Sequence, residues 1–221
     1  MWLCEICRTL VPALDLNICL ECGSPDHERH RCPVAGQHVD RARASYPYTG
    51  WVAASIKRFK YGDEPARAED LAARMLPMVA AFGAIDVVVP VPLHASKFNL
   101  RGYNQSELLA TRIAARANLP MKPLLIRTTA TRPQVTLDRQ SRHENVTGAF
   151  SLNPEWSIPA GQRILLIDDV RTTGATTDAC AKVFKEDART RSVFVLTFAQ
   201  ELSNAELRRW RQSISASPSE I

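Results

Sequence analysis

The chain has 221 residues, of which 45% are hydrophobic and 23% charged, and its formal net charge is +5 at pH 7. A hydrophobic share of this size supplies a core and excludes global disorder, and the length suits one α/β domain with a small appendage. No apolar run approaches the ~18–20 residues of a membrane span, and the N-terminus lacks the basic start and apolar stretch of a signal peptide, so a cytoplasmic location is expected.

Residues 1–40 are predicted to form a small cysteine module. Four of the six cysteines form two Cys-x-x-Cys pairs separated by eleven residues: Cys4, Cys7, Cys19 and Cys22. Each pair can bind one edge of a tetrahedral Zn²⁺, so the four thiolates predict a closed, structural zinc site. The alternative is reduced thiols without metal. Irregular spacing leaves open whether a second metal binds the remaining candidates, Cys32, His27, His30 and His38.

The main domain is predicted over residues 41–212, and its first half alternates short apolar runs with helical patterns. In chain order, the expected elements are a strand at 44–48, a helix at 51–61, a helical stripe at 64–82 that Pro77 kinks or ends, a buried strand at 85–89 and a helix at 105–118. Asn104 and Glu107 stand three apart at the start of the last helix, as in a capping box.

The second half continues the alternation. The expected elements are brief strands at 124–126 and 148–152, a polar, basic loop over 127–142, a buried strand at 164–167, a helix at 174–186, a strand at 192–199 and a short helix at 202–211. Strands that alternate with helices from residue 85 onward predict an α/β fold with a mostly parallel sheet flanked by helices. The polar tail, residues 213–221, is predicted to be disordered.

The strongest chemical signal is the segment 163–177. An apolar strand runs into Asp168 and Asp169, and a short loop rich in hydroxyls then opens a helix. Backbone N–H groups at a helix N-terminus suit a phosphate, and the carboxylates suit sugar hydroxyls or Mg²⁺. The candidate ligand-binding residues of the loop are Arg171, Thr172, Thr173, Gly174, Ala175 and Thr176. The alternative is an ordinary strand–turn–helix corner with a threonine as N-cap.

A second loop follows the strand at 85–89. Two prolines stiffen its start, and Lys97 and Arg101 are candidates to clamp a diphosphate, with Asn104 and Gln105 as amide donors. The alternative is a surface loop whose basic side chains are solvated.

The segment 164–177 closely resembles the phosphoribosyl-diphosphate (PRPP) binding motif of type I phosphoribosyltransferases. The resemblance implies that Asp168 and Asp169 contact the ribose hydroxyls and that Thr172 to Thr176 cradle the 5-phosphate. The purine-salvage members of this superfamily carry a carboxylate where this chain has Thr172, so the sequence points away from purine salvage and identifies no general base.

Several separate motifs, in the right order, resemble the ComF family of competence proteins. They are Val-Pro-Val-Pro-Leu-His at 89–94, Arg-Gly-Tyr-Asn-Gln at 101–105, Gln134 with Arg142, Asn-Val-Thr-Gly-Ala-Phe at 145–150, the aspartate–threonine segment at 168–176 and Phe-Lys-Tyr-Gly at 59–62. The resemblance implies a type I phosphoribosyltransferase-like domain behind an N-terminal Cys4 zinc module, and a role in natural transformation or in an unassigned PRPP-linked step. The chain departs from the family at 185–191, where a small Gly-Ala turn is usual.

Two functions are expected from these observations. The first is a PRPP-binding phosphoribosyltransferase that uses Mg²⁺ and transfers phosphoribosyl to an unidentified nitrogen acceptor, with Asp168, Asp169, Lys97 and Arg101 as catalytic residues; whether it turns over is left open. The second is a non-catalytic competence factor that binds single-stranded DNA, because residues 97–142 hold nine Lys and Arg against two acidic residues. A solvated basic face explains the same charge. Ribose 5-phosphate is a further candidate ligand, and a homo-oligomer is left open.

Overall fold

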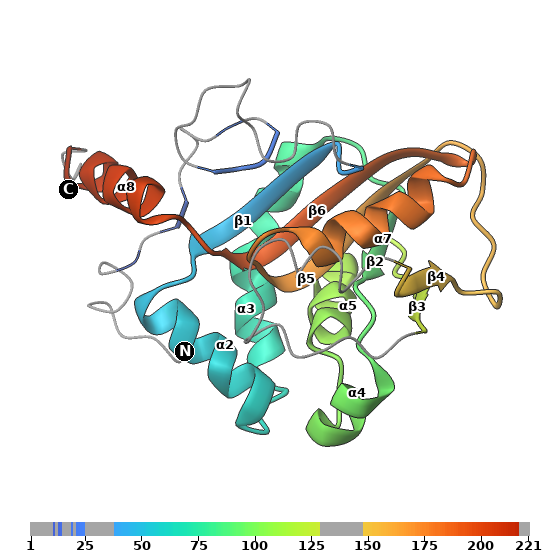
Figure 1. The fold of residues 1–221 in the computed structure, drawn as a ribbon, viewed down its shortest axis with the longest axis horizontal. Coiled ribbons are helices and arrows are strands. Elements are labelled where there is room, and N and C mark those ends of the chain that lie inside the picture. Colours follow the sequence, from blue (N-terminus) through green and yellow to red (C-terminus); the bar gives the residue numbers. More distant parts are fainter. Residues whose placement is uncertain are drawn as a thin grey trace.

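A parallel sheet forms the centre of the molecule (Figure 1). The computed structural model describes residues 38–128 and 148–216 and, before them, residues 11, 13–14, 19 and 21–24. Within these residues the sheet has the strand order β1-β6-β5-β2, with all neighbours parallel. Its strands are β1 (Arg41–Pro47), β2 (Val87–Pro90), β5 (Gln162–Arg171) and β6 (Thr190–Gln200). A two-stranded antiparallel sheet pairs β3 (Leu125–Arg127) with β4 (Phe150–Leu152). The predicted α/β class is confirmed.

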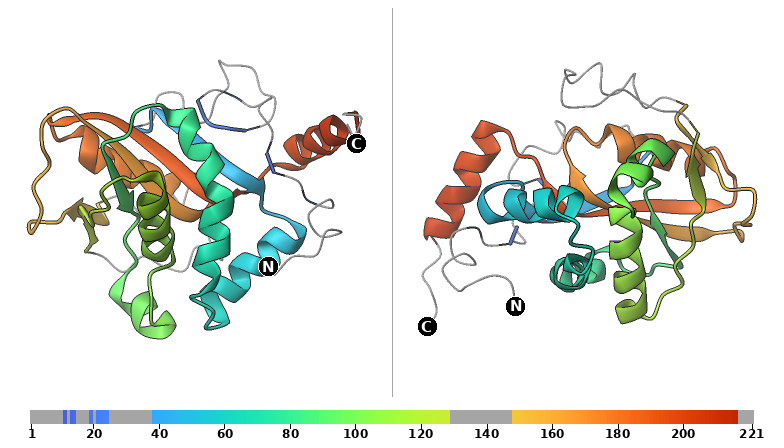
Figure 2. Two further views of the ribbon diagram at one scale, coloured as in Figure 1. Left: turned by 180° about the vertical axis from the view of Figure 1, so that it is seen from behind. Right: turned by 90° about the horizontal axis from the view of Figure 1, so that it is seen from below.

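Helices cover both faces of this sheet (Figure 2). α3 (Arg67–Met75) and α5 (Gln105–Ala117) pack on one face, and α7 (Ala175–Lys185) packs on the other. The remaining helices are α2 (Gly50–Tyr61), the 3-10 helix η2 (Leu76–Phe82), α4 (Ala95–Arg101) and α8 (Asn204–Ala216). The stripe expected at 64–82 is an α-helix only as far as Met75, because Pro77 has no N–H to donate and the chain continues as a 3-10 helix. α4 lies in a segment that was expected to be a loop.

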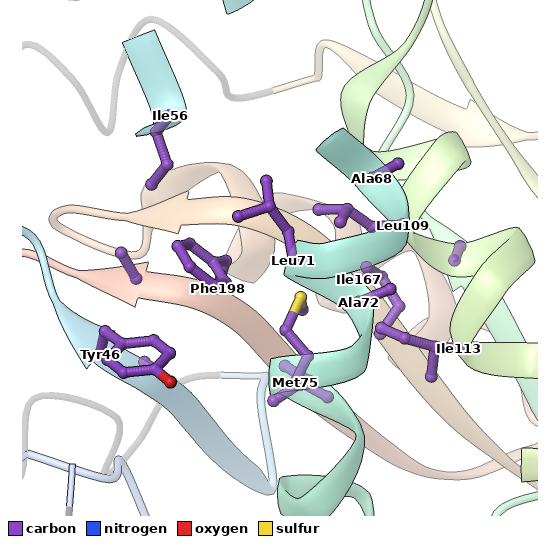
Figure 3. Packing of buried hydrophobic residues seen from close by; sticks show 14 of the residues in the cluster. Tyr46, Ile56, Ala68, Leu71, Ala72, Met75, Leu109, Ile113, Ile167 and Phe198 are labelled. Carbon is purple, nitrogen blue, oxygen red and sulfur yellow. The ribbon is translucent and has the colours of Figure 1, made fainter. Parts of the chain in front are cut away.

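Alternating side chains of β5 build two cores. Ile164 and Leu166 belong to the core on the α7 face, whereas Leu165 and Ile167 belong to the opposite core. Figure 3 shows the second core, where side chains of α3 and α5 pack together with Ile167 and Phe198. Each fully buried aliphatic or aromatic side chain contributes about 1.5–3 kcal/mol by leaving water, so the sheet is a rigid platform for its carboxyl edge.

The β1 edge of the sheet is covered by the N-terminal segment. The N–H of Leu14 donates to the Ser45 carbonyl at 2.9 Å, and the N–H of Ala42 donates to the Glu21 carbonyl at 2.6 Å. Gly23 is needed here, since its φ is +71° and a Cβ would lie 2.8 Å from the Ala42 oxygen. These contacts cover part of an edge strand whose backbone would otherwise be open to another chain.

β5 is longer than the sequence pattern indicated. β2 pairs with it only as far as Ile167, whereas β6 follows it to the pair of Arg171 with Gln200. The expected strand end at 167 is therefore wrong, and Asp168 and Asp169 lie within the last part of β5. Because β2 has already left the sheet at this level, these carboxylates face an open crevice at the carboxyl edge, where α/β sheets bind ligands.

Several predictions fall on residues outside the described ranges. They concern Cys4, Cys7, His27, His30, Cys32, Gln134, Arg142, most of the loop 127–142 and the last part of the tail 213–221. In the part of the tail that is described, α8 continues to Ala216, and Trp210 of this helix is buried. No helix within the described ranges combines the length and hydrophobicity that crossing a membrane requires.

Candidate functional site

A pocket of about 230 Å³ lies at the carboxyl edge of the sheet. It is bordered by the end of β5, the loop that opens α7, the loop after β2 and the start of α5. All of the residues predicted to act in catalysis or ligand binding line it: Asp168, Asp169, Lys97, Arg101, Arg171, Thr172, Thr173, Gly174, Ala175 and Thr176. Segments about seventy positions apart in sequence therefore meet in one cavity.

The two carboxylates at the pocket are held by different partners. An oxygen of Asp169, whose side chain is buried, lies 2.9 Å from the Lys60 ammonium. Asp168 accepts hydrogen bonds from the Ser106 hydroxyl at 2.8 Å and from the backbone N–H of Asp169 at 2.9 Å. Burial and the neighbouring charge of Asp169 raise the pKa of Asp168 to about 6. The pair therefore carries less negative charge near neutral pH than two solvated carboxylates would.

Lys60 is a site residue that the sequence analysis missed. Burial alone lowers its pKa, but the charge of Asp169 and the hydrogen bond to it outweigh burial, so the net pKa is raised and the ammonium stays protonated at neutral pH. The available signal was its position in the Phe-Lys-Tyr-Gly motif at 59–62, to which no chemistry was assigned. Ser106 and Arg127 also line the pocket without having been predicted as site residues.

The loop before α7 has the form of a phosphate cradle. Gly174 is the N-cap of α7 with φ +83°, a conformation that favours glycine, and it supplies no side chain to cap the helix. The N–H of Ala175 donates to the Thr173 hydroxyl at 3.3 Å, and the Thr177 hydroxyl donates to the Gly174 carbonyl at 2.9 Å. Gly174, as the N-cap, offers no side-chain acceptor of its own, and a helix N-terminus of this kind favours a phosphate.

The opposite wall of the pocket carries positive charge. Burial and the nearby charges of Arg127, Arg101 and Lys60 lower the pKa of Lys97. The Arg101 guanidinium donates to the Gln105 side chain at 2.9 Å and to the Tyr61 hydroxyl at 3.2 Å, and it stacks 4.9 Å from the centre of the Tyr61 ring. Lys97, Arg101 and Arg127 line one cavity together, and such a cluster of cationic side chains favours an anion.

Arg171 borders the pocket, but its guanidinium is buried on another side. It donates to the backbone carbonyl of Cys22 and to the Gln200 side chain. The Gln200 amide in turn donates to the Ser24 hydroxyl at 2.5 Å. The middle of the segment 168–176 is therefore tied to the second cysteine pair.

This cysteine pair forms a tight turn. The N–H of Gly23 donates to the Cys19 carbonyl at 2.9 Å, and the N–H of Ser24 lies 3.4 Å from the Cys22 sulfur. Neither cysteine is in a disulfide, and burial raises the pKa of the Cys22 thiol. Within the described ranges, no three or more His, Cys, Asp or Glu side chains lie close enough together to hold a metal ion. His38 bonds Asp178 through its backbone N–H, at 2.8 Å, and its ring.

The chain is similar in sequence to curated bacterial proteins. It is 30% identical over 138 residues to competence protein F of Haemophilus influenzae, a match that spans 59% of this chain and only 60% of that protein. It is 26% identical over 211 residues to competence protein ComFC of Bacillus subtilis, which spans 88% of this chain and 82% of the relative. It is also 26% identical to the DNA utilization protein YhgH of Escherichia coli K12, over 82% of this chain and 83% of that one. No protein-family model matches.

Solved structures with a similar arrangement include phosphoribosyltransferases. An adenine phosphoribosyltransferase matches with a TM-score of 0.39 and 14% identity, over 70% of this chain and 79% of that one. The glutamine PRPP amidotransferase of Bacillus subtilis matches with a TM-score of 0.41 and 20% identity, over 68% of this chain and 34% of that one.

Proposed function

The chain is a homologue of bacterial competence and DNA utilization proteins over most of its length, and we propose that its pocket binds PRPP together with Mg²⁺. Ribose 5-phosphate is the weaker ligand in this proposal. The observation that carries it is the convergence of three different groups on one cavity: a hydroxyl loop at a helix N-terminus, a carboxylate pair and a basic wall.

Each group suits one part of PRPP. The loop from Thr172 to Thr176 suits the 5-phosphate, because α7 begins there without a side-chain cap. Asp168 and Asp169 suit the ribose hydroxyls as acceptors. Lys97 and Arg101 suit the diphosphate, whose charge exceeds that of the 5-phosphate.

The carboxylate oxygens also fit Mg²⁺, which prefers hard oxygen donors. Asp168 and Asp169 would hold it together with the diphosphate, and when bound it neutralises charge on that group. The fit is incomplete on the protein side, since one carboxylate is already paired with Lys60. Most of the oxygen atoms that coordinate Mg²⁺ would therefore come from the phosphates of PRPP.

The reaction that suits this arrangement is displacement at C1 of the ribose. The C1–O bond breaks and its electron pair leaves with the diphosphate, while a nitrogen lone pair of the acceptor forms the new bond to C1. The ammonium of Lys97 and the guanidinium of Arg101 line the pocket and would stabilise the negative charge that grows on the leaving diphosphate. Proton loss from the acceptor is not assigned to a side chain, because Thr172 offers only a hydroxyl at the relevant position.

Calorimetry of PRPP with Mg²⁺ tests the proposal. Wild-type protein should bind PRPP more tightly than ribose 5-phosphate, and Asp168→Asn with Asp169→Asn should weaken both. Each charged hydrogen bond that is lost costs about 1.5–3 kcal/mol. Wild-type protein that gives no heat and no thermal protection with millimolar PRPP and Mg²⁺ would rule the proposal out.

A second candidate is binding of single-stranded DNA, favoured by two exposed aromatic rings near the basic wall. Tyr61 is 68% exposed beside Arg101, and Phe98 is 45% exposed on α4. Cationic surfaces with stacking rings suit single strands. Fluorescence anisotropy with an oligothymidylate should show affinity that falls steeply with salt, with a flatter slope in Arg101→Ala and weaker binding in Tyr61→Ala. Binding that does not change with salt, or none at low salt, would remove this candidate.

We also propose a structural Zn²⁺ on Cys4, Cys7, Cys19 and Cys22. The turn of the second pair supports it, because the N–H of Ser24 points at the Cys22 sulfur and such a bond favours the thiolate that Zn²⁺ requires. The first pair lies outside the described residues.

A further inference from the structure

Lys60 occupies a fixed place at the floor of the pocket. It is the penultimate residue of α2, next to the fully buried Phe59. The carbonyl of Phe59 accepts a hydrogen bond of 2.6 Å from the Tyr103 hydroxyl, which holds the last turn of the helix against the loop before α5. The Lys60 ammonium, with its side chain 23% exposed, then reaches Asp169 at 2.9 Å. A cation at the C-terminal end of a helix is also favoured by the helix dipole.

The ammonium changes what the carboxylate pair offers to a divalent cation. Asp169 is already neutralised by Lys60, and one oxygen of Asp168 is engaged by the Ser106 hydroxyl and a backbone N–H. The described residues supply no third acidic, histidine or cysteine ligand nearby. Mg²⁺ needs six oxygen ligands in close to octahedral geometry and loses its waters reluctantly, so a pair of carboxylates with a resident cation is a poor site for it.

We propose that Lys60 is a built-in counter-cation that makes divalent-metal binding at Asp168 and Asp169 conditional on a diphosphate. The ligand-free protein excludes the metal, because an approaching divalent ion meets the positive charge of Lys60. A metal that arrives already bound to a diphosphate brings its own ligands and negative charge, and these offset that repulsion. The metal therefore enters as part of the ligand complex. The identity of the sugar rests on the function proposed above, whereas the behaviour of Lys60 toward the metal does not.

The test uses Mn²⁺ as a probe and electron paramagnetic resonance to count the free ion, with the full-length protein and no sugar phosphate. Wild-type protein should bind Mn²⁺ weakly, and Lys60→Gln should bind one equivalent at least about tenfold more tightly. Lys60→Arg keeps the charge and should remain weak. Lys57→Gln is the matched control, because it makes the same change on an exposed position of α2 and should behave as wild type. Adding Asp169→Asn to Lys60→Gln should abolish the gain.

A second measurement needs no variant, so poor folding of Lys60→Gln would not remove the test. With inorganic diphosphate added, wild-type protein should retain about one Mn²⁺ per chain on a filter that passes both free Mn²⁺ and free Mn²⁺–diphosphate. Tight, one-to-one Mn²⁺ binding to wild type without diphosphate would overturn the inference, as would a folded Lys60→Gln protein with no gain. Absence of PRPP binding in calorimetry, with the Lys60→Gln gain still present, would instead remove the proposed sugar ligand and leave the role of Lys60 intact.

Discussion

Replacement of Lys97 by Met tests the diphosphate half of the site, because it removes one charge and little volume. No hydrogen bond or ion pair of the Lys97 ammonium is found within the described ranges, and burial together with Arg127, Arg101 and Lys60 lowers the pKa of this side chain. Since the pKa of a lysine is lowered on folding, the protonated form that dominates at neutral pH is disfavoured in the folded state. We therefore expect Lys97→Met to unfold at the same temperature as wild type or at a higher one.

The effect on ligand binding should have the opposite sign. One charge-assisted hydrogen bond to the diphosphate is worth about 1.5–3 kcal/mol, so PRPP should bind Lys97→Met about 10- to 150-fold more weakly. Ribose 5-phosphate has no diphosphate, and its affinity should change by less than about fivefold, the range of a screened charge at longer distance.

Calorimetry with both ligands and thermal unfolding of the same preparations measure these effects. Lys57→Met, on the exposed face of α2, controls for the loss of a lysine elsewhere. Equal weakening of both ligands would show that Lys97 does not act on the diphosphate. A lower unfolding temperature for Lys97→Met, with Lys57→Met unchanged, would show that the charge serves the fold rather than a ligand.

Three further outcomes are expected. Thr173→Val should weaken PRPP and ribose 5-phosphate alike in calorimetry, because the 5-phosphate is common to both; a loss confined to PRPP would contradict the cradle. Metal analysis should find about one Zn²⁺ per chain, lost in Cys4→Ser with Cys7→Ser, and protein purified without chelator that contains none would refute it. Hydrogen bonds from Arg163 lower the pKa of Asp86 from 3.8 to about 2. The extra stability of wild type over Asp86→Asn should therefore be fully present above about pH 4 and should be lost as the pH falls toward 2. A difference in stability that does not change with pH would disprove this linkage.

Local patterns were sufficient for the elements that bury a continuous apolar run. β2 and the first part of β5 are such runs, and both were predicted as buried strands. α4 was missed because it has only seven residues and buries none of them, so it carries no helical stripe. The last part of β5 was missed because Asp168 and Asp169 resemble a strand end, and only pairing with β6, which is distant in sequence, keeps them extended.

In the candidate site, too, local features could be predicted from the sequence and long-range contacts could not. The loop that opens α7 could be read from adjacent residues, since a helix N-terminus and its hydroxyls are local features. Lys60 could not be placed in this way, because its contact with Asp169 joins segments more than one hundred positions apart and depends on where α2 packs in the folded chain. The contacts of the Arg171 side chain could not be predicted either, because they depend on the packing of the cysteine turn against β6.

The link from Arg171 to the cysteine turn affects how genetic data on such a protein are interpreted. A substitution at Cys22 that unfolds the turn would displace the backbone carbonyl that accepts from Arg171, so it would perturb the loop before α7 even if the cysteines never met the ligand. A truncation before residue 41 would do the same and would also uncover the edge of β1. Cysteine mutants and loop mutants should therefore share a phenotype. The shared phenotype would show that the two segments are in structural contact, not that both bind the same substrate.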